Sequence, residues 1–266
     1  PRYQYSQPST KVIWQDGPTE GLSWESQLLV LKASHPDLVC WEVKTPSAKR
    51  TYEAVRRLWE ALPDTWVILV GDHVTALPQE PHAVLGGQGN LTVLTGGDYD
   101  FGLVAGLNSK RPVPMEEIDR CQVSLVAPTK GSQIGTIWNY ATSSKLETLP
   151  VIDRELCKWK LYSRMGNYLY RPGTHGYSAR DCWWRHEGGC TFCSWTNTFK
   201  NYRQLSVDQF MADVESAYAL GAREYFDDAG TWAPPGRWFE DAINRLDRFN
   251  GHRSHARARI AFGCND

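Results

Sequence analysis

Residues 181–195 read Asp-Cys-Trp-Trp-Arg-His-Glu-Gly-Gly-Cys-Thr-Phe-Cys-Ser-Trp and contain three of the seven cysteines, Cys182, Cys190 and Cys193. Three thiolates in one short loop indicate a metal site that keeps one open position. An iron-sulfur cube held by three cysteines leaves one iron free for an outside ligand, whereas a structural zinc ion takes four protein ligands. A zinc site is the alternative, because His186 lies between the cysteines and could supply the fourth ligand.

The residues after this loop predict alternating helices and strands. Ser206 and Gln209 form a capping box at the start of an amphipathic helix, and residues 224–226 then resemble a strand. A second amphipathic helix follows, and residues 257–262 return as a strand. This order predicts the start of a β/α barrel, with the cysteines in the loop after its first strand. Active sites of such barrels lie at the carboxyl ends of the strands, where these loops begin.

The C-x7-C-x2-C loop, with Phe192 between its last two cysteines, resembles the cluster loop of radical S-adenosylmethionine (SAM) enzymes of the cobalamin-associated type. The resemblance implies that the three cysteines hold a [4Fe-4S] cluster, whose open iron binds the amino and carboxylate groups of SAM. Reductive cleavage of SAM would give a 5′-deoxyadenosyl radical. Phe192 would contact the adenine of SAM.

The same resemblance implies a polar residue after the second barrel strand that holds the amino group of SAM. Asp227 and Asp228 occupy that place. Because neighbouring side chains of a strand point to opposite faces, we expect only one of them to face the cofactor, and Asp228 is the preferred candidate. Alternatively, the pair caps the next turn.

The first hundred residues predict repeated strand-helix units. Strand-like segments at residues 11–15, 37–43, 65–70 and 91–95 are separated by helical segments, one of which Ser47 is expected to cap. Such repeats predict a doubly wound parallel sheet, which binds ligands beyond the carboxyl ends of its strands. The predicted fold class is therefore α/β, with this sheet followed by an incomplete barrel.

The loops after these strands resemble those of the cobalamin-binding domains that precede radical SAM barrels. The resemblance implies that Thr45, Ser47, Gly71 and Gly97 line a groove for the nucleotide tail of cobalamin. His73 lies in one of these loops, and we interpret it as an ordinary hydrogen-bonding side chain.

Residues 16–21 depart from the pattern of cobalamin domains that supply a histidine ligand to cobalt from below. Pro18 stands where that histidine would be. We therefore expect either cobalamin bound without a lower protein ligand or a domain that has kept the fold and lost the cofactor.

The sequence predicts three regions: a cobalamin-binding-like domain at 1–106, a connector with a possible hairpin at 107–171, and the first part of the barrel at 172–266. A complete barrel needs further strand-helix units. We therefore expect a truncated chain, whose activity on its own is doubtful.

Composition favours a cytoplasmic enzyme. The formal net charge of the 266 residues is -1, which argues against a nucleic-acid partner, and no apolar run approaches the ~20 residues of a membrane span. An odd number of cysteines, three of them clustered, fits a reducing compartment.

The predicted reaction is methyl transfer to an unactivated carbon of a small molecule or peptide, with flavodoxin or ferredoxin as electron donor. A radical SAM cyclase or rearrangement enzyme is the alternative within this class. A zinc-stabilised, non-catalytic module that senses a ligand is the alternative outside it.

Overall fold

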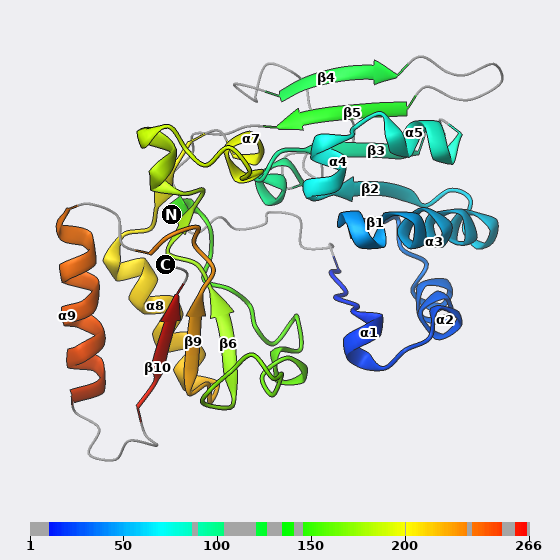
Figure 1. Cartoon of the computed structure of the whole chain (residues 1–266). Coiled ribbons are helices and arrows are strands. Elements are labelled where there is room, and N and C mark those ends of the chain that lie inside the picture. The colour runs from blue at the N-terminus through cyan, green and yellow to red at the C-terminus, as the bar shows by residue number, and fades with distance from the viewer. Residues whose placement is uncertain are drawn as a thin grey trace. The chain divides into compact units, whose positions relative to one another are not determined.

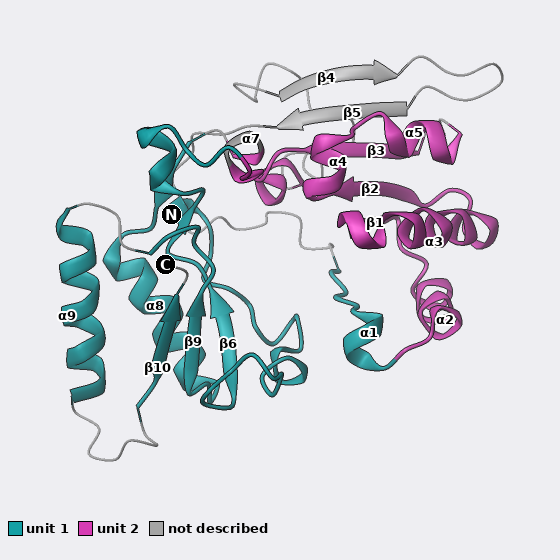
Figure 2. Ribbon diagram, viewed as in Figure 1, with its two compact units in different colours: residues 1–21, 144–191, 201–266 teal, residues 22–143, 192–200 magenta. Residues whose placement is uncertain are grey.

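The structure is a computed structural model of the chain, and it describes residues 11–86, 90–103, 121–126, 135–140, 146–199, 201–232, 236–251 and 259–264. In residues 121–126, 135–140 and 196–197 only the backbone is described. The chain forms two compact units, shown in Figure 2: unit 1 contains Pro1–Gly21, Ser144–Thr191 and Asn201–Asp266, and unit 2 contains Leu22–Ser143 and Phe192–Lys200. Each unit is built from separate stretches of the chain, and the three consecutive regions expected from the sequence stay a prediction.

Unit 2 is built on a five-stranded sheet with the order β1-β2-β3-β5-β4 (Figure 1). Strands β1, β2, β3 and β5 are parallel, and β4 pairs antiparallel with β5. The two strands expected to form a hairpin therefore pair with each other, and β5 also pairs with β3. The strands are β1 Leu38–Glu42, β2 Trp66–Val70, β3 Leu91–Thr95, β4 Cys121–Val126 and β5 Gly135–Tyr140.

The central strands of unit 2 are buried on both faces. Val67 and Leu69 of β2 join a core that includes Val55 and Leu58 of α3, whereas Ile68 and Val70 join a cluster on the opposite face. A parallel sheet covered on both faces needs such continuous apolar runs. The helical segments of the unit are α2 Trp24–Ser34, a 3-10 turn Thr45–Ser47, α3 Ala48–Ala61, α4 Asp72–Ala76, α5 Glu80–Leu85 and α7 Trp195–Thr198.

Unit 1 contains a three-stranded parallel sheet with the order β10-β9-β6 and two long helices, α8 and α9 (Figure 1). The order β6, α8, β9, α9, β10 confirms the strand-helix alternation predicted for the start of a barrel. The elements are β6 Gly173–Gly176, α8 Val207–Ala219, β9 Glu224–Asp227, α9 Arg237–Gly251 and β10 Ala261–Cys264. Shorter ones are α1 Gly17–Glu20, Leu146–Thr148, Trp159–Leu161, β7 Ala179–Arg180, Trp183–Glu187 and β8 Arg203–Gln204.

Helix α8 begins and packs largely as its sequence predicts. The Ser206 hydroxyl accepts a hydrogen bond from the Gln209 amide at 3.2 Å, which is half of the predicted capping box. The Gln209 side chain instead donates to the Leu149 carbonyl at 2.9 Å. Phe210 is fully buried, and its ring lies 6.0 Å from that of Tyr225 in β9. Since Tyr225 faces α8, its strand neighbour Phe226 points to the other face of the sheet.

Two local predictions are wrong. Residues 11–15 form no strand, and residues 16–21 belong to unit 1, where Asp16 caps the short helix α1 by accepting from the Thr19 amide at 3.0 Å. The Ser47 hydroxyl donates to the Lys44 carbonyl at 3.1 Å and makes no capping bond to α3.

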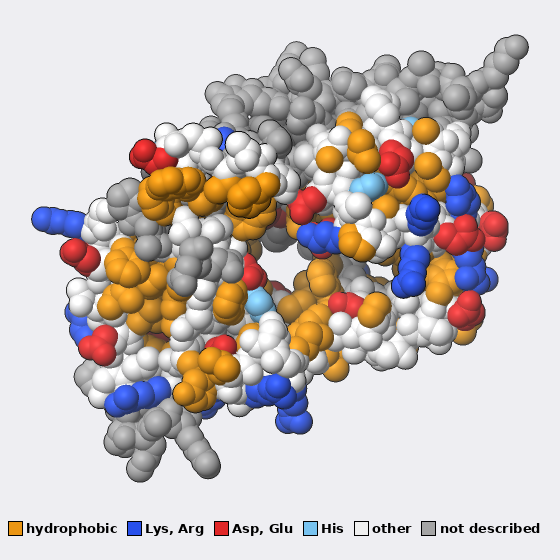
Figure 3. Space-filling model, in the orientation of Figure 1, with side chains coloured by type: hydrophobic (Ala, Val, Ile, Leu, Met, Phe, Trp, Pro, Cys, Tyr) orange, Lys and Arg blue, Asp and Glu red, His pale blue; other side chains and the backbone are white. Residues whose placement is uncertain are grey.

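Charges of both signs are interspersed on the face seen in Figure 3. Arg56 of α3 pairs with Glu53 of the same helix, and Arg57 of α3 pairs with Glu25 of α2. Within the described ranges, the structure has no helix that combines the length and the apolar character of a membrane span.

Candidate functional site

The cysteine loop connects β6 to α8 and leaves the sheet of unit 1 at the carboxyl end of β6. Cys182 and Cys193 are partly exposed, Cys190 is exposed, and all three thiols are free of disulfides. Soft thiolates suit an iron-sulfur cluster, so the donor chemistry fits. Among the described residues, however, no three His, Cys, Asp or Glu side chains form a gathered ligand set. Cys182 and Cys190 belong to unit 1 and Cys193 to unit 2. The ligand set thus stays a prediction.

A buried ion pair anchors the start of the cysteine loop. Asp181 is fully buried and has a φ of 69°, in the left-handed region, directly before Cys182. Its carboxylate pairs with the Arg185 guanidinium one helical turn later. Burial raises the pKa of Asp181, while the Cys182 amide and Arg185 act in the opposite direction. The pair therefore fixes the backbone that presents Cys182.

The two adjacent aspartates differ sharply in environment. Asp227 is fully buried, and its Oδ1 accepts hydrogen bonds from the amides of Ser178 and Ala229, each at 2.9 Å. Burial raises the pKa of Asp227. The Asp228 side chain, in contrast, is 53% exposed and accepts a hydrogen bond from His175 Nδ1 at 2.8 Å. Only Asp228 is therefore accessible to a ligand of the size of SAM, whereas Asp227 binds the loop after β6.

Tyr202 adds a buried hydroxyl beside the cysteine loop. Neither this hydroxyl nor Asp227 Oδ2 has a hydrogen-bond partner in the described part of the chain, although both are buried. The pKa of Tyr202 is raised by burial, then by Asp227 and by Cys182. Buried polar groups without partners are uncommon in folded proteins, so this end of the sheet has unused hydrogen-bonding capacity.

Phe192 is 89% exposed, so its ring is free to stack on a planar ligand. In unit 2 the same stretch of chain continues into α7, where the Thr198 carbonyl accepts from the Gly97 amide at 2.7 Å. A Cβ at Gly97 would overlap the ring of Phe199. Position 97 therefore requires glycine because the Phe199 ring packs against it.

The other candidate cobalamin residues lie at the carboxyl ends of β1 and β2. His73 is buried, with Nδ1 3.2 Å from Thr45 Oγ1 and Nε2 3.3 Å from Glu80 Oε1. Both ring nitrogens are thus engaged within the protein. Gly71 has a φ of 109°, and a Cβ there would lie 2.9 Å from the Val43 carbonyl oxygen, so a side chain is excluded.

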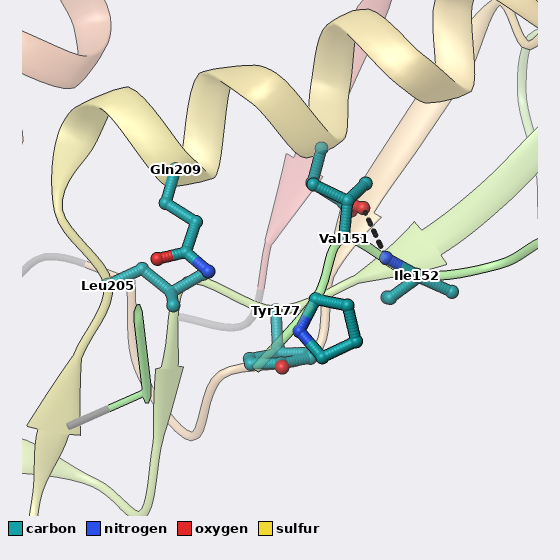
Figure 4. A pocket seen from close by; sticks show the side chains of 7 residues that line it. Val151, Ile152, Tyr177, Leu205 and Gln209 are labelled. Carbon is teal, nitrogen blue, oxygen red and sulfur yellow. Dashed lines mark hydrogen bonds between the residues drawn. The ribbon is translucent and has the colours of Figure 1, made fainter. Parts of the chain in front are cut away.

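A small pocket in unit 1 lies between the start of α8 and residues 150–152 (Figure 4). Gln209 and Leu205 lie on one side of it, and Val151 and Ile152 on the other. Its volume of about 10 Å³ is at the limit for one water molecule, so it is no ligand site. The lining residues are Pro150, Val151, Ile152, Tyr177, Leu205, Gln209 and Asp213.

Sequence reasoning missed His175 and Tyr202. His175 had one available signal, its place at the end of the strand before the cysteine loop. Tyr202 had none, because its proximity to Asp227 depends on how residues 201–204 pack within unit 1.

The chain matches no protein-family model and no curated protein. Its fold matches a radical S-adenosylmethionine methyltransferase, TsrM, from Kitasatospora setae. The structure with cobalamin and a [4Fe-4S] cluster bound has a TM-score of 0.64 and 12% identity, over 96% of this chain and 49% of that one. The structure with tryptophan substrate and the SAM analogue aza-SAM has a TM-score of 0.63 and 13% identity, over 96% of this chain and 48% of that one.

A third structure is apo, selenomethionine-labelled OxsB, a cobalamin-dependent S-adenosylmethionine radical enzyme. Its TM-score is 0.61 at 15% identity, over 91% of this chain and 32% of that one. The chain has the fold of these enzymes. It spans about half the length of the TsrM structures and about a third of OxsB. At these identities the likeness shows the fold alone.

Proposed function

We propose that this chain is the cobalamin-binding and SAM-binding part of a radical SAM enzyme that transfers a methyl group to an unactivated carbon. The observation that carries the proposal is the position of the C-x7-C-x2-C loop. It leaves the carboxyl end of β6, in a fold that matches TsrM and OxsB. Active sites of β/α barrels lie at that end of the strands.

Three cysteines and two further side chains have roles in this proposal. Cys182, Cys190 and Cys193 would hold a [4Fe-4S] cluster, which supplies the electron for SAM cleavage when it is bound. The exposed ring of Phe192 would stack on the adenine of SAM. Asp228 would pair with the amino group of SAM, since it is the accessible member of the aspartate pair.

The loops of unit 2 would bind cobalamin through Thr45, Ser47 and the backbone of Gly71 and Gly97. His73 is not available as a cobalt ligand, because Thr45 and Glu80 engage both of its ring nitrogens. We therefore propose that cobalt has no lower ligand from His73.

Anaerobic reconstitution of the full chain with iron and sulfide tests the proposal. We expect a brown protein that binds iron and inorganic sulfide, and a Cys190→Ala variant that has lost the colour. A colourless protein with one bound zinc ion would contradict the proposal and favour the zinc-stabilised ligand-sensing module.

The reaction itself is tested with methyl-labelled SAM and a reductant such as flavodoxin or ferredoxin. Label transferred to a carbon of the substrate supports methyl transfer. Consumption of SAM with an unlabelled, cyclised or rearranged product would contradict methyl transfer and leave the radical SAM assignment in place.

A further inference from the structure

His175 and Asp228 lie together at the carboxyl end of the sheet of unit 1. His175 is the third residue of β6 and is paired in register with Phe226, and Asp228 directly follows β9. Phe226 faces away from α8, as argued from Tyr225, and the His175 ring lies 5.4 Å from the ring of Phe226. Both side chains therefore belong to the sheet face opposite α8, which in a β/α barrel is the interior.

The hydrogen bonds around His175 select one tautomer. An ionised Asp228 can only accept, so His175 Nδ1, 2.8 Å from Asp228 Oδ2, carries the proton. The other ring nitrogen, Nε2, lies 3.3 Å from Asn167 Nδ2, which can only donate. With the amide oriented in this way, Asn167 donates a hydrogen bond to His175, and His175 donates one to Asp228.

Packing holds the imidazole in place. The ring of Tyr168 is buried and lies edge-on to His175 at 5.4 Å, and Phe226 covers another side. Burial and Asp228 raise the pKa of Tyr168 to about 12, so its hydroxyl stays neutral beside the carboxylate. The His175 side chain is 40% exposed, so the pair is open to a ligand on its remaining side.

Asp228 keeps one oxygen for a ligand. Oδ2 accepts from His175, and in the described part of the chain Oδ1 has no hydrogen-bond partner. The hydrogen bond to Oδ2 fixes the orientation of the carboxylate, and Oδ1 can then accept a hydrogen bond from a ligand. An ammonium group suits this position, because charge-assisted hydrogen bonds to a carboxylate are strong when the geometry is fixed.

We infer that His175 is a positioning residue, which orients the Asp228 carboxylate toward the ammonium group of SAM through an N–H at the place of Nδ1. The inference rests on the proposed function. It adds to that function a specific requirement: position 175 must supply a donor at Nδ1, and a donor at Nε2 does not serve.

The test compares His175→Asn with His175→Gln. The asparagine amide nitrogen takes the place of Nδ1, and the glutamine amide nitrogen that of Nε2, so the two variants have the same functional group and differ by one methylene. We expect SAM affinity, measured by isothermal calorimetry on the reconstituted full chain, to fall about tenfold in His175→Gln and by no more than about threefold in His175→Asn.

Methylthioadenosine, which lacks the amino-acid part of SAM, is the matched probe. Its affinity should be the same for the wild-type protein and both variants. In an Asp228→Asn background, His175→Gln should have no further effect on SAM affinity. If His175→Gln fails to fold, Asn167→Ala replaces it, and it should weaken the binding of SAM but not of methylthioadenosine.

Equal SAM affinities of the two histidine variants would overturn the positioning role, and so would a parallel loss of methylthioadenosine binding. Either result, with normal SAM binding by the wild-type protein, leaves the proposed function intact. A wild-type protein that binds no SAM after reconstitution overturns the proposed function and the positioning role together.

Discussion

Arg154 and Asp213 form a buried, two-point ion pair in unit 1. Arg154 Nη1 donates to Asp213 Oδ1 at 2.8 Å and Nη2 to Oδ2 at 2.6 Å, and the side chains are only 2% and 7% exposed. The Tyr225 hydroxyl also donates to Asp213 Oδ2, at 2.8 Å. The pair ties the segment before β6 to α8, and thereby sets the position of the strand that leads into the cysteine loop.

We predict that breaking this pair is costly. Asp213→Leu leaves the buried Arg154 charge without an opposite charge and should lower the free energy of unfolding by about 3 kcal/mol or more. The double variant Arg154→Met/Asp213→Leu should recover much of that loss, because both charges are then removed. Urea unfolding followed by circular dichroism measures both effects. A double variant less stable than Asp213→Leu would contradict the prediction.

Gly176 should tolerate no side chain. A Cβ at Gly176 would overlap the Tyr225 hydroxyl and lie 2.8 Å from Asp213 Oδ2. Gly176→Ala should therefore destabilise the protein by about 1–3 kcal/mol in thermal or urea unfolding. Gly166→Ala is the matched control, because nothing lies within 4 Å of a Cβ there. Equal stability of the two variants would contradict the prediction, because the backbone at the end of β6 would then be able to shift and make room for a Cβ.

Asp227 should make stability depend on pH. Burial raises its folded-state pKa above the unfolded value, so the folded protein binds the proton more tightly. The stability of the wild-type protein then falls as pH rises from about 4 through that raised pKa. Asp227→Asn keeps the Oδ1 acceptor but carries no charge, so relative to the wild type it should gain stability over the same pH range.

Urea unfolding between about pH 4 and 7.5 tests this. The control is Asp247→Asn on the exposed face of α9. The same pH dependence in both variants would contradict a specific effect of the buried carboxyl.

The three loop cysteines should be needed for iron, and other cysteines should not. Single alanine variants of Cys182, Cys190 and Cys193 should each bind less iron after anaerobic reconstitution. Cys157→Ser should bind as much as the wild type, because Cys157 donates its thiol hydrogen to the Arg154 carbonyl and serine keeps a donor there. Iron content and visible absorption measure the outcome, and loss of iron in Cys157→Ser would point to a general folding defect.

Ser47 should contribute to cobalamin retention. In Ser47→Ala we expect less hydroxocobalamin to remain bound after desalting, because a hydroxyl of the groove is lost. Ser34→Ala is a close control, since both hydroxyls donate to the carbonyl three residues earlier at 3.1 Å. Equal retention by the two variants would remove Ser47 from the proposed groove.

Local patterns predicted most elements of the fold. The apolar strand β2 and the Ser206 cap of α8 each follow from neighbouring residues, and both appear as expected. The strand predicted at residues 11–15 was wrong. Its alternating pattern is too short to form a strand without a partner, and these residues have no partner strand.

The sequence by itself determined the order of strands and helices and the place of the cysteine loop after a barrel strand, since these depend on spacing along the chain. Only the tertiary structure decided that Asp228 is open and Asp227 buried, and that His175 and Arg154 meet partners more than fifty residues away. The period of a strand says that neighbouring side chains face opposite ways. Which way each one faces depends on the helix that packs against the sheet, and here α8 covers the side of Tyr225.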